Sequence, residues 1–79
     1  MSLSARLVLF DDAECWVRET TLPFPPFPGL GLRLDVYQVV NVLSVVVGDP
    51  GYDVTCIVEV EGGPDCGFDA LGFRRGSYP

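Results

Sequence analysis

The side chains that could carry chemistry are few, and they are acids and thiols. The chain has no histidine and no lysine, so it lacks the commonest general base and the amine that forms Schiff bases. Carboxylates come in two close pairs, Asp11 with Asp12 and Glu59 with Glu61. The first pair lies in a predicted turn and the second points outward from a predicted strand. We therefore expect solvated charges rather than an acid–base couple or a calcium site.

The three thiols give no metal or redox pattern. Cys15, Cys56 and Cys66 are unevenly spaced and include no C-x-x-C pair, which is atypical of a secreted disulfide scaffold or a zinc site. Cys15 and Cys56 lie in strand patterns, where a free cysteine is usually a small core residue, although a bridge between them stays open. Cys66, in the loose C-terminal stretch, is the thiol expected to be most exposed. The sequence predicts no enzyme, no metal site and no cofactor.

Net charge narrows the range of partners. Five arginines against eleven acids give a net charge of -6, which repels nucleic acid and anionic membranes. Residues 1–6 lack the pattern of a signal peptide, and the longest apolar stretch, 39–47, is too short to span a bilayer. We expect a cytoplasmic protein, in the host cytoplasm if a bacteriophage encodes it.

A long β-hairpin organises the rest of the chain. Its arms, Val36–Val47 and Val54–Glu61, are rich in β-branched residues, and residues 48–53 between them are turn formers. The first arm is apolar on both faces. This predicts a bulge near Asn41 or Ser44, a strand that bends across two sheets, or a second face that meets a partner chain. On the second arm, Val54, Cys56, Val58 and Val60 are predicted to face the core, while Thr55, Ile57, Glu59 and Glu61 point outward.

Alternating residues predict three shorter strands, at Leu3–Phe10, Glu14–Leu22 and Leu30–Asp35. The short link at 11–13 makes the first two an antiparallel hairpin. In the first strand, Leu3, Ala5, Leu7 and Leu9 are expected to face the core. In the second, Cys15 and Val17 are expected to continue that face, with Glu14, Trp16, Arg18 and Thr20 outward.

Prolines break the chain between the second and third strands. Residues 22–29 hold four prolines, which exclude a central strand or a helix and predict an extended connection. We expect Phe24 and Phe27 to cover one end of the core, because so small a domain needs their apolar area. The alternative is a proline-rich ligand for an aromatic groove of another protein.

Five short strands suit a small, partly open barrel. The run "LPFPPFPGLGLRL" followed by "VYQVVNVLSVVV" resembles the small SH3-like barrels of bacterial and bacteriophage proteins, which share a shape and no common chemistry. An OB-like barrel is the structural alternative. We predict an all-β, five-stranded SH3-like barrel at residues 1–61 and a glycine-rich, partly ordered tail at 62–79.

The function predicted is a non-catalytic protein-interaction module, such as an accessory or inhibitor protein of a bacteriophage or mobile element. The alternatives are a structural homo-oligomer, as in a virion or assembly, and capture of a small ligand at a subunit cleft. The predicted partner is a protein or a second copy, with no nucleic acid and no membrane. The candidate interaction residues are Trp16, Phe24, Phe27, Tyr52, Ile57, Phe68, Leu71 and Phe73.

Overall fold

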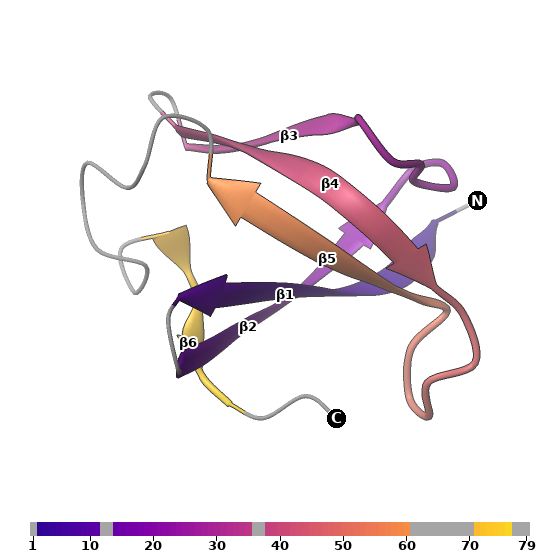
Figure 1. The fold of residues 1–79 in the computed structure, drawn as a ribbon. Helices are drawn as coiled ribbons and strands as arrows, with labels where there is room; N and C mark the ends of the chain where they lie inside the picture. Colours follow the sequence, from indigo (N-terminus) through magenta and orange to yellow (C-terminus); the bar gives the residue numbers. More distant parts are fainter. Residues whose placement is uncertain (1, 12–13, 36–37, 61–70, 77–79) are drawn as a thin grey trace.

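The computed structural model describes residues 2–11, 14–35, 38–60 and 71–76, and this part of the protein is all-β. One sheet contains β1 (Leu3–Asp11), β2 (Glu14–Leu22), β3 (Gly31–Asp35), β4 (Gln38–Val46), β5 (Val54–Val60) and β6 (Arg74–Arg75). The strand order is β3-β4-β5-β1-β2-β6. The sheet curls into an open half-barrel (Figure 1). The all-β class and the barrel-like shape are confirmed, and the SH3-like resemblance stays a prediction.

Both predicted hairpins form. β4 pairs with β5 antiparallel from Val40 opposite Val60 to Val46 opposite Thr55. β1 pairs with β2 antiparallel along its full length. The two hairpins join through a parallel pairing of β1 with β5, in which Leu7 lies opposite Cys56. The middle of the sheet is therefore built from strands that lie about fifty residues apart in the sequence.

The core lies on the concave face of the curled sheet. The buried cluster consists of Ala5, Leu7, Leu9, Leu22, Val40, Val42, Val54, Cys56, Val58, Leu71 and Phe73. The predicted inward positions of β1 and β5 are confirmed except for Leu3, which is not in the cluster. Ala5, Leu7 and Leu9 of β1 and Val54, Cys56 and Val58 of β5 belong to it, and Val60 packs against it. Burial of these side chains is the main favourable term that holds so small a domain together.

The face predicted for β2 is wrong. Trp16 packs against the core cluster and Arg18 reaches inward, whereas Val17 is buried on the opposite face, opposite Val8. The two-residue hairpin link explains the error. It places Phe10 opposite Cys15, so odd positions of β1 share a face with even positions of β2.

The expected bulge lies next to Ser44. The register of β4 on β5 shifts between Val42, which is opposite Val58, and Ser44, which is opposite Ile57. A bulge adds one residue to one strand and turns the following side chains to the other face. Val42, opposite Val58, and Val45, opposite Cys56, consequently both pack on the core, whereas Leu43 and Ser44 between them are exposed.

A sixth strand, β6, corrects the predicted number of five. β6 pairs with the edge of β2, where Arg75 lies opposite Trp16. Leu71 and Phe73, just before it, are only 2% exposed and complete the core. Two paired residues in a glycine-rich stretch carry no alternation that a sequence pattern could detect. Residues 71–76 of the predicted tail thus pack on the sheet, and Phe68 lies outside the described residues.

Candidate functional site

The loop after β4 folds over the convex face of the sheet. Asp49, Pro50, Gly51 and Tyr52 form a turn in which the Tyr52 amide donates to the Asp49 carbonyl at 3.4 Å. Gly51 has a φ of 89°, and proline followed by glycine with positive φ is typical of a type II turn. The turn brings the Asp49 side chain back over β1 and β5.

Asp49 is the centre of a polar cluster that we call the Asp49 cluster, made of Arg6, Asp49, Tyr52 and Thr55. One oxygen, Asp49 Oδ2, accepts from Arg6 Nη2 at 2.8 Å and from Thr55 Oγ1 at 2.7 Å. The Arg6 guanidinium lies 4.8 Å from the centroid of the Tyr52 ring. Thr55 was predicted to face outward, and it does lie on the convex face, but the loop buries it completely. The Arg6 guanidinium thus joins the Tyr52 ring to the cluster.

Ser4 and Asp53 fasten the end of this loop to β1. The Ser4 amide donates to Asp53 Oδ2 at 2.9 Å, and the Asp53 amide donates to both Ser4 Oγ and Ser4 O at 3.0 Å. Each residue thus satisfies a backbone donor of the other, much as in a helix capping box. The pair fixes where β5 begins alongside β1.

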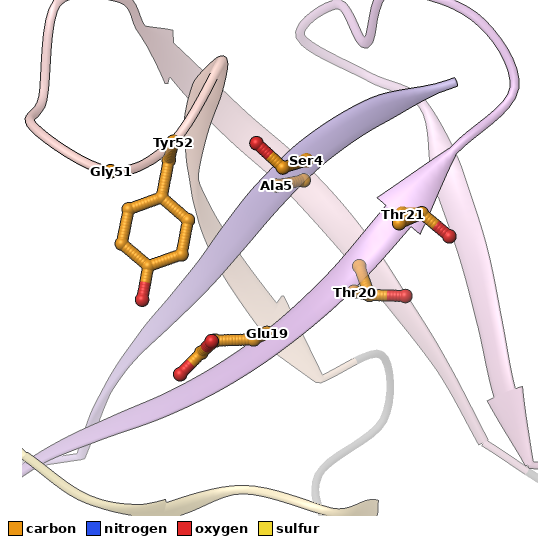
Figure 2. A pocket seen from close by; sticks show the side chains of 7 residues that line it. All are labelled: Ser4, Ala5, Glu19, Thr20, Thr21, Gly51 and Tyr52. Carbon is orange, nitrogen blue, oxygen red and sulfur yellow. The ribbon is translucent and has the colours of Figure 1, made fainter. Parts of the chain in front are cut away.

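A groove of about 440 Å³ lies between this loop and β2, lined by Ser4, Ala5, Glu19, Thr20, Thr21, Gly51 and Tyr52. Figure 2 shows the Glu19 carboxylate extending on the same side as the Tyr52 hydroxyl, while the Thr20 and Thr21 hydroxyls point away from the ring. Glu19 Oε1 accepts from Arg74 Nη2 at 2.7 Å, which neutralises the charged group of the wall. The groove is open and polar, and its lining carries hydroxyls and one acid that is paired with Arg74.

The proline-rich connection forms a second, similar turn; residues 22–30 are called here the proline–phenylalanine loop. The Leu30 amide donates to the Phe27 carbonyl at 3.1 Å, and Gly29 has a φ of 96°, as expected for a type II turn with proline at its second position. Two hydrogen bonds of 2.8 Å, from the Gly29 amide to the Val42 carbonyl and from the Val42 amide to the Leu30 carbonyl, attach this turn to β4.

The two phenylalanines of this loop point outward, which corrects the expectation that they cover the core. Phe24 is 44% exposed and Phe27 is 53% exposed, and neither belongs to the core cluster. Leu22 and Pro26 are buried instead and anchor the loop. A turn of fixed geometry with buried anchors leaves the rings little freedom to fold back on the domain.

The other candidate interaction residues lie in different parts of the structure and do not form one surface. Trp16 is half-buried, with the Arg75 guanidinium 5.6 Å from its ring centroid, and Tyr52 belongs to the Asp49 cluster. Ile57 is half-buried on the convex face, and Leu71 and Phe73 are inside the core. Only Phe24 and Phe27, among the candidates in the described residues, are large apolar side chains with more than about a third of their surface exposed.

Three exposed apolar residues were not among the candidate interaction residues. They are Phe10, Leu43 and Val47, with 54%, 50% and 73% of their surfaces exposed. Leu43 and Val47 sit in a valine-rich run that is typical of a buried strand, so composition gave no warning. The Asp49 cluster was missed as well, because Arg6 and Asp49 are 43 residues apart and only the parallel pairing brings them together.

The thiols within the described residues are separate. Cys15 is half-buried, Cys56 is fully buried, and both are free, so the bridge that the sequence left open does not form here. Burial raises the pKa of the Cys56 thiol, which disfavours its reactive thiolate. Cys66 lies outside the described residues. No group of three or more metal-ligating side chains occurs in the part of the chain that the structure describes.

No family model, curated protein or solved structure matches the chain. In the described part of the molecule, no helix has the length and apolar character needed to cross a membrane.

Proposed function

We propose that the protein is a non-catalytic protein-interaction module that contacts its partner through the proline–phenylalanine loop. The single observation that carries this proposal is the exposure of Phe24 and Phe27, at 44% and 53%, on a loop whose base is bonded to β4. A chain of this size has few apolar side chains to spare from its core. Two rings left outside represent a cost in stability that binding would offset.

Rigidity makes the loop suited to recognition. Prolines fix φ along the loop, and the turn at 27–30 is closed by a hydrogen bond of 3.1 Å. An aromatic side chain on a preorganised loop loses little conformational entropy on binding. Most of the free energy gained by burying its ring therefore contributes to affinity. We expect the partner to offer an apolar groove with two pockets for the rings.

The chemistry of the groove in Figure 2 supports a binding role over a catalytic one. Its acid, Glu19, is paired with Arg74, and Ser4 Oγ donates to Asp53 Oδ2 at 3.3 Å while it accepts from the Asp53 amide. Both carboxylates are thus engaged in contacts that fasten segments to the sheet, and the chain has no histidine to act as a general base beside the hydroxyl.

Quantitative affinity capture from the cell that produces the protein tests the proposal. The variant is Phe24→Ser with Phe27→Ser, and the control is Phe10→Ser, because Phe10 is equally exposed at 54% but lies at the end of β1. We expect a partner retained by the native protein and by the control to lose at least ten-fold in recovery with the double variant. Equal recovery by all three proteins, or retention of no protein by the native chain, would refute the proposal.

A further inference from the structure

The outer edge of β2 has a strand neighbour along only part of its length. β6 pairs with β2 at Trp16 and Val17, and in the described part of the chain no strand pairs with residues 18–21 on that side. Backbone N–H and C=O groups that point outward from such an edge can pair with an added strand. A partner segment in an extended conformation therefore finds backbone partners along residues 18–21.

The groove beside this edge presents two oxygen atoms to the same open space. Glu19 Oε1 accepts from Arg74, whereas Glu19 Oε2 accepts no hydrogen bond from the residues that the structure describes. The Tyr52 hydroxyl, which lies on the same side as the Glu19 carboxylate in Figure 2, has no hydrogen-bond partner among those residues either. A side chain with several N–H donors can bind both oxygen atoms at once.

β6 shows which side chain has this property. Its two residues are arginines on a strand that pairs with β2, and each binds an acid of β2. Arg74 donates to Glu19 at 2.7 Å, and Arg75 donates to Glu14 at 2.9 Å. The Arg75 guanidinium also lies 5.6 Å from the centroid of the Trp16 ring. A guanidinium combines these contacts because its planar array of donors matches a carboxylate and its face stacks on aromatic rings.

We propose that residues 18–21 of β2 pair with an extended segment of a partner protein, and that an arginine of this segment binds in the groove. The arginine lies opposite Glu19, because directly opposite residues of neighbouring strands project on the same face of a sheet. Its guanidinium donates to Glu19 Oε2 and to the Tyr52 hydroxyl. This surface is separate from the proline–phenylalanine loop, and the proposal is independent of the function proposed for that loop.

The charge of the protein favours a basic segment. The net charge of -6 attracts cationic partners and opposes acidic ones. The arginine of the free edge, Arg18, does not oppose a basic segment at close range, because its guanidinium reaches inward and donates to the Leu71 carbonyl at 2.7 Å. Arg74 does oppose it, because it shares the Glu19 carboxylate. The side chains of this ion pair are 72% and 51% exposed, so the pair is weak and removing Arg74 should tighten binding.

A titration followed by NMR tests the proposal. The ¹⁵N-labelled native chain is titrated with the blocked peptide Thr-Thr-Arg-Thr-Thr, and separately with the same peptide carrying citrulline, which has the shape of arginine without its charge. We expect the arginine peptide to shift the amide signals of residues 18–21 and of Gly51 and Tyr52. The citrulline peptide should bind at least ten-fold more weakly.

Two matched pairs of variants locate the binding site. Glu19→Gln should weaken binding of the arginine peptide at least ten-fold, whereas Glu59→Gln, the same change at an exposed acid of β5 outside the groove, should leave it unchanged. Arg74→Gln should tighten binding several-fold, whereas Arg75→Gln, with the same change in net charge, should not. All four side chains are exposed, so we expect these variants to fold.

Three results would overturn the proposal: no amide shift at millimolar peptide, equal binding of the citrulline peptide, or undiminished binding by Glu19→Gln. Phe24→Ser with Phe27→Ser separates this surface from the proline–phenylalanine loop. Binding of the arginine peptide should be unchanged in this double variant. Loss of binding there, with shifts in residues 22–30 of the native chain, would place the peptide on the loop and contradict the pairing with β2.

Discussion

Two loops of this molecule contain the same type of turn, but one loop packs on the sheet and the other exposes its side chains to solvent. Asp49–Tyr52 and Phe27–Leu30 each close on a proline followed by a glycine with positive φ. The first turn folds down on the sheet and buries a polar cluster, and the second is bonded to β4 at its base and holds Phe24 and Phe27 in solvent.

The difference comes from the residue that enters each turn. Aspartate at position 49 finds a guanidinium and a hydroxyl on the convex face, and these contacts hold the loop against the sheet. Phenylalanine at position 27 is 53% exposed and does not belong to the core cluster, which includes Leu71 and Phe73. The turn fixes the direction of the backbone. Whether the loop packs on the sheet or stays in solvent depends on the side chains of the sheet that it can contact.

Among changes to the two loops, the largest effect should follow from breaking the Asp49 cluster. Asp49→Ala removes the acceptor of both the Arg6 guanidinium and the buried Thr55 hydroxyl, and we expect a loss of about 2–3 kcal/mol in the free energy of unfolding. Urea denaturation measures it, and Asp49→Asn, which keeps an oxygen acceptor, should lose less. A cost below about 0.5 kcal/mol would show that the cluster does not hold the loop.

The two turn glycines should respond alike. Gly29→Ala and Gly51→Ala each place a Cβ at positive φ, with no atom within 4 Å to clash. We expect each to cost about 1 kcal/mol, since the strain is in the backbone alone. Thermal unfolding of both variants checks the equality. A large cost at one position only would mean that the two turns are not equivalent.

Removing the displayed rings should leave stability nearly unchanged. Phe24→Ser with Phe27→Ser changes two exposed side chains, so we expect a shift of at most about 0.5 kcal/mol per residue in the free energy of unfolding. Phe73→Ser is the contrast, because that ring is 2% exposed and its loss should cost about 3–5 kcal/mol. If the loop variant is destabilised as strongly as Phe73→Ser, the rings pack on the domain.

The smallest effect should appear in alkaline solution. Burial raises the pKa of Cys56 in the folded protein above its ordinary value of 9.0, so only the unfolded chain gains from ionising this thiol as the pH passes that value. The contribution of Cys56 is complete below pH 9 and declines as the pH rises further. Urea denaturation between pH 8 and 10 should show a steeper fall for the native chain than for Cys56→Ala. Equal slopes would contradict the burial of an ionisable thiol.

The sequence predicts where the strands lie, but it does not predict which distant strands pair. Alternation located β1 and β2, and β-branched runs located β4 and β5, because local propensity and burial agree there. The β1–β5 pairing that creates the Asp49 cluster joins residues more than 40 apart in the chain, and no local pattern reports it. The face of β2 was predictable, because a two-residue link places odd-numbered residues of β1 opposite even-numbered residues of β2. The prediction ignored that rule.

For the candidate site, the sequence likewise identified residues of interest but did not predict which of them are exposed. Phe24 and Phe27 were recognised from their composition as either a core cover or a ligand, but exposure depends on whether another segment fills the core first. Leu71 and Phe73, from a stretch with no periodicity, are in the core cluster, whereas Phe24 and Phe27 are not. Leu43 was missed because it lies at the bulge next to Ser44, and alternation does not show which side chain a bulge leaves outside the core. Val47 was missed because it belongs to the same apolar run but lies just past the end of β4.

Fluorine NMR of the chain labelled with 4-fluorophenylalanine tests most directly whether the proline–phenylalanine loop displays its rings. A soluble paramagnetic agent relaxes each fluorine according to its exposure, and single Phe→Tyr variants assign the signals. We expect strong relaxation at Phe24 and Phe27, comparable with Phe10, and weak relaxation at Phe73. If Phe24 and Phe27 were as protected as Phe73 in the monomer, the loop would be part of the core and the proposed contact surface would not exist.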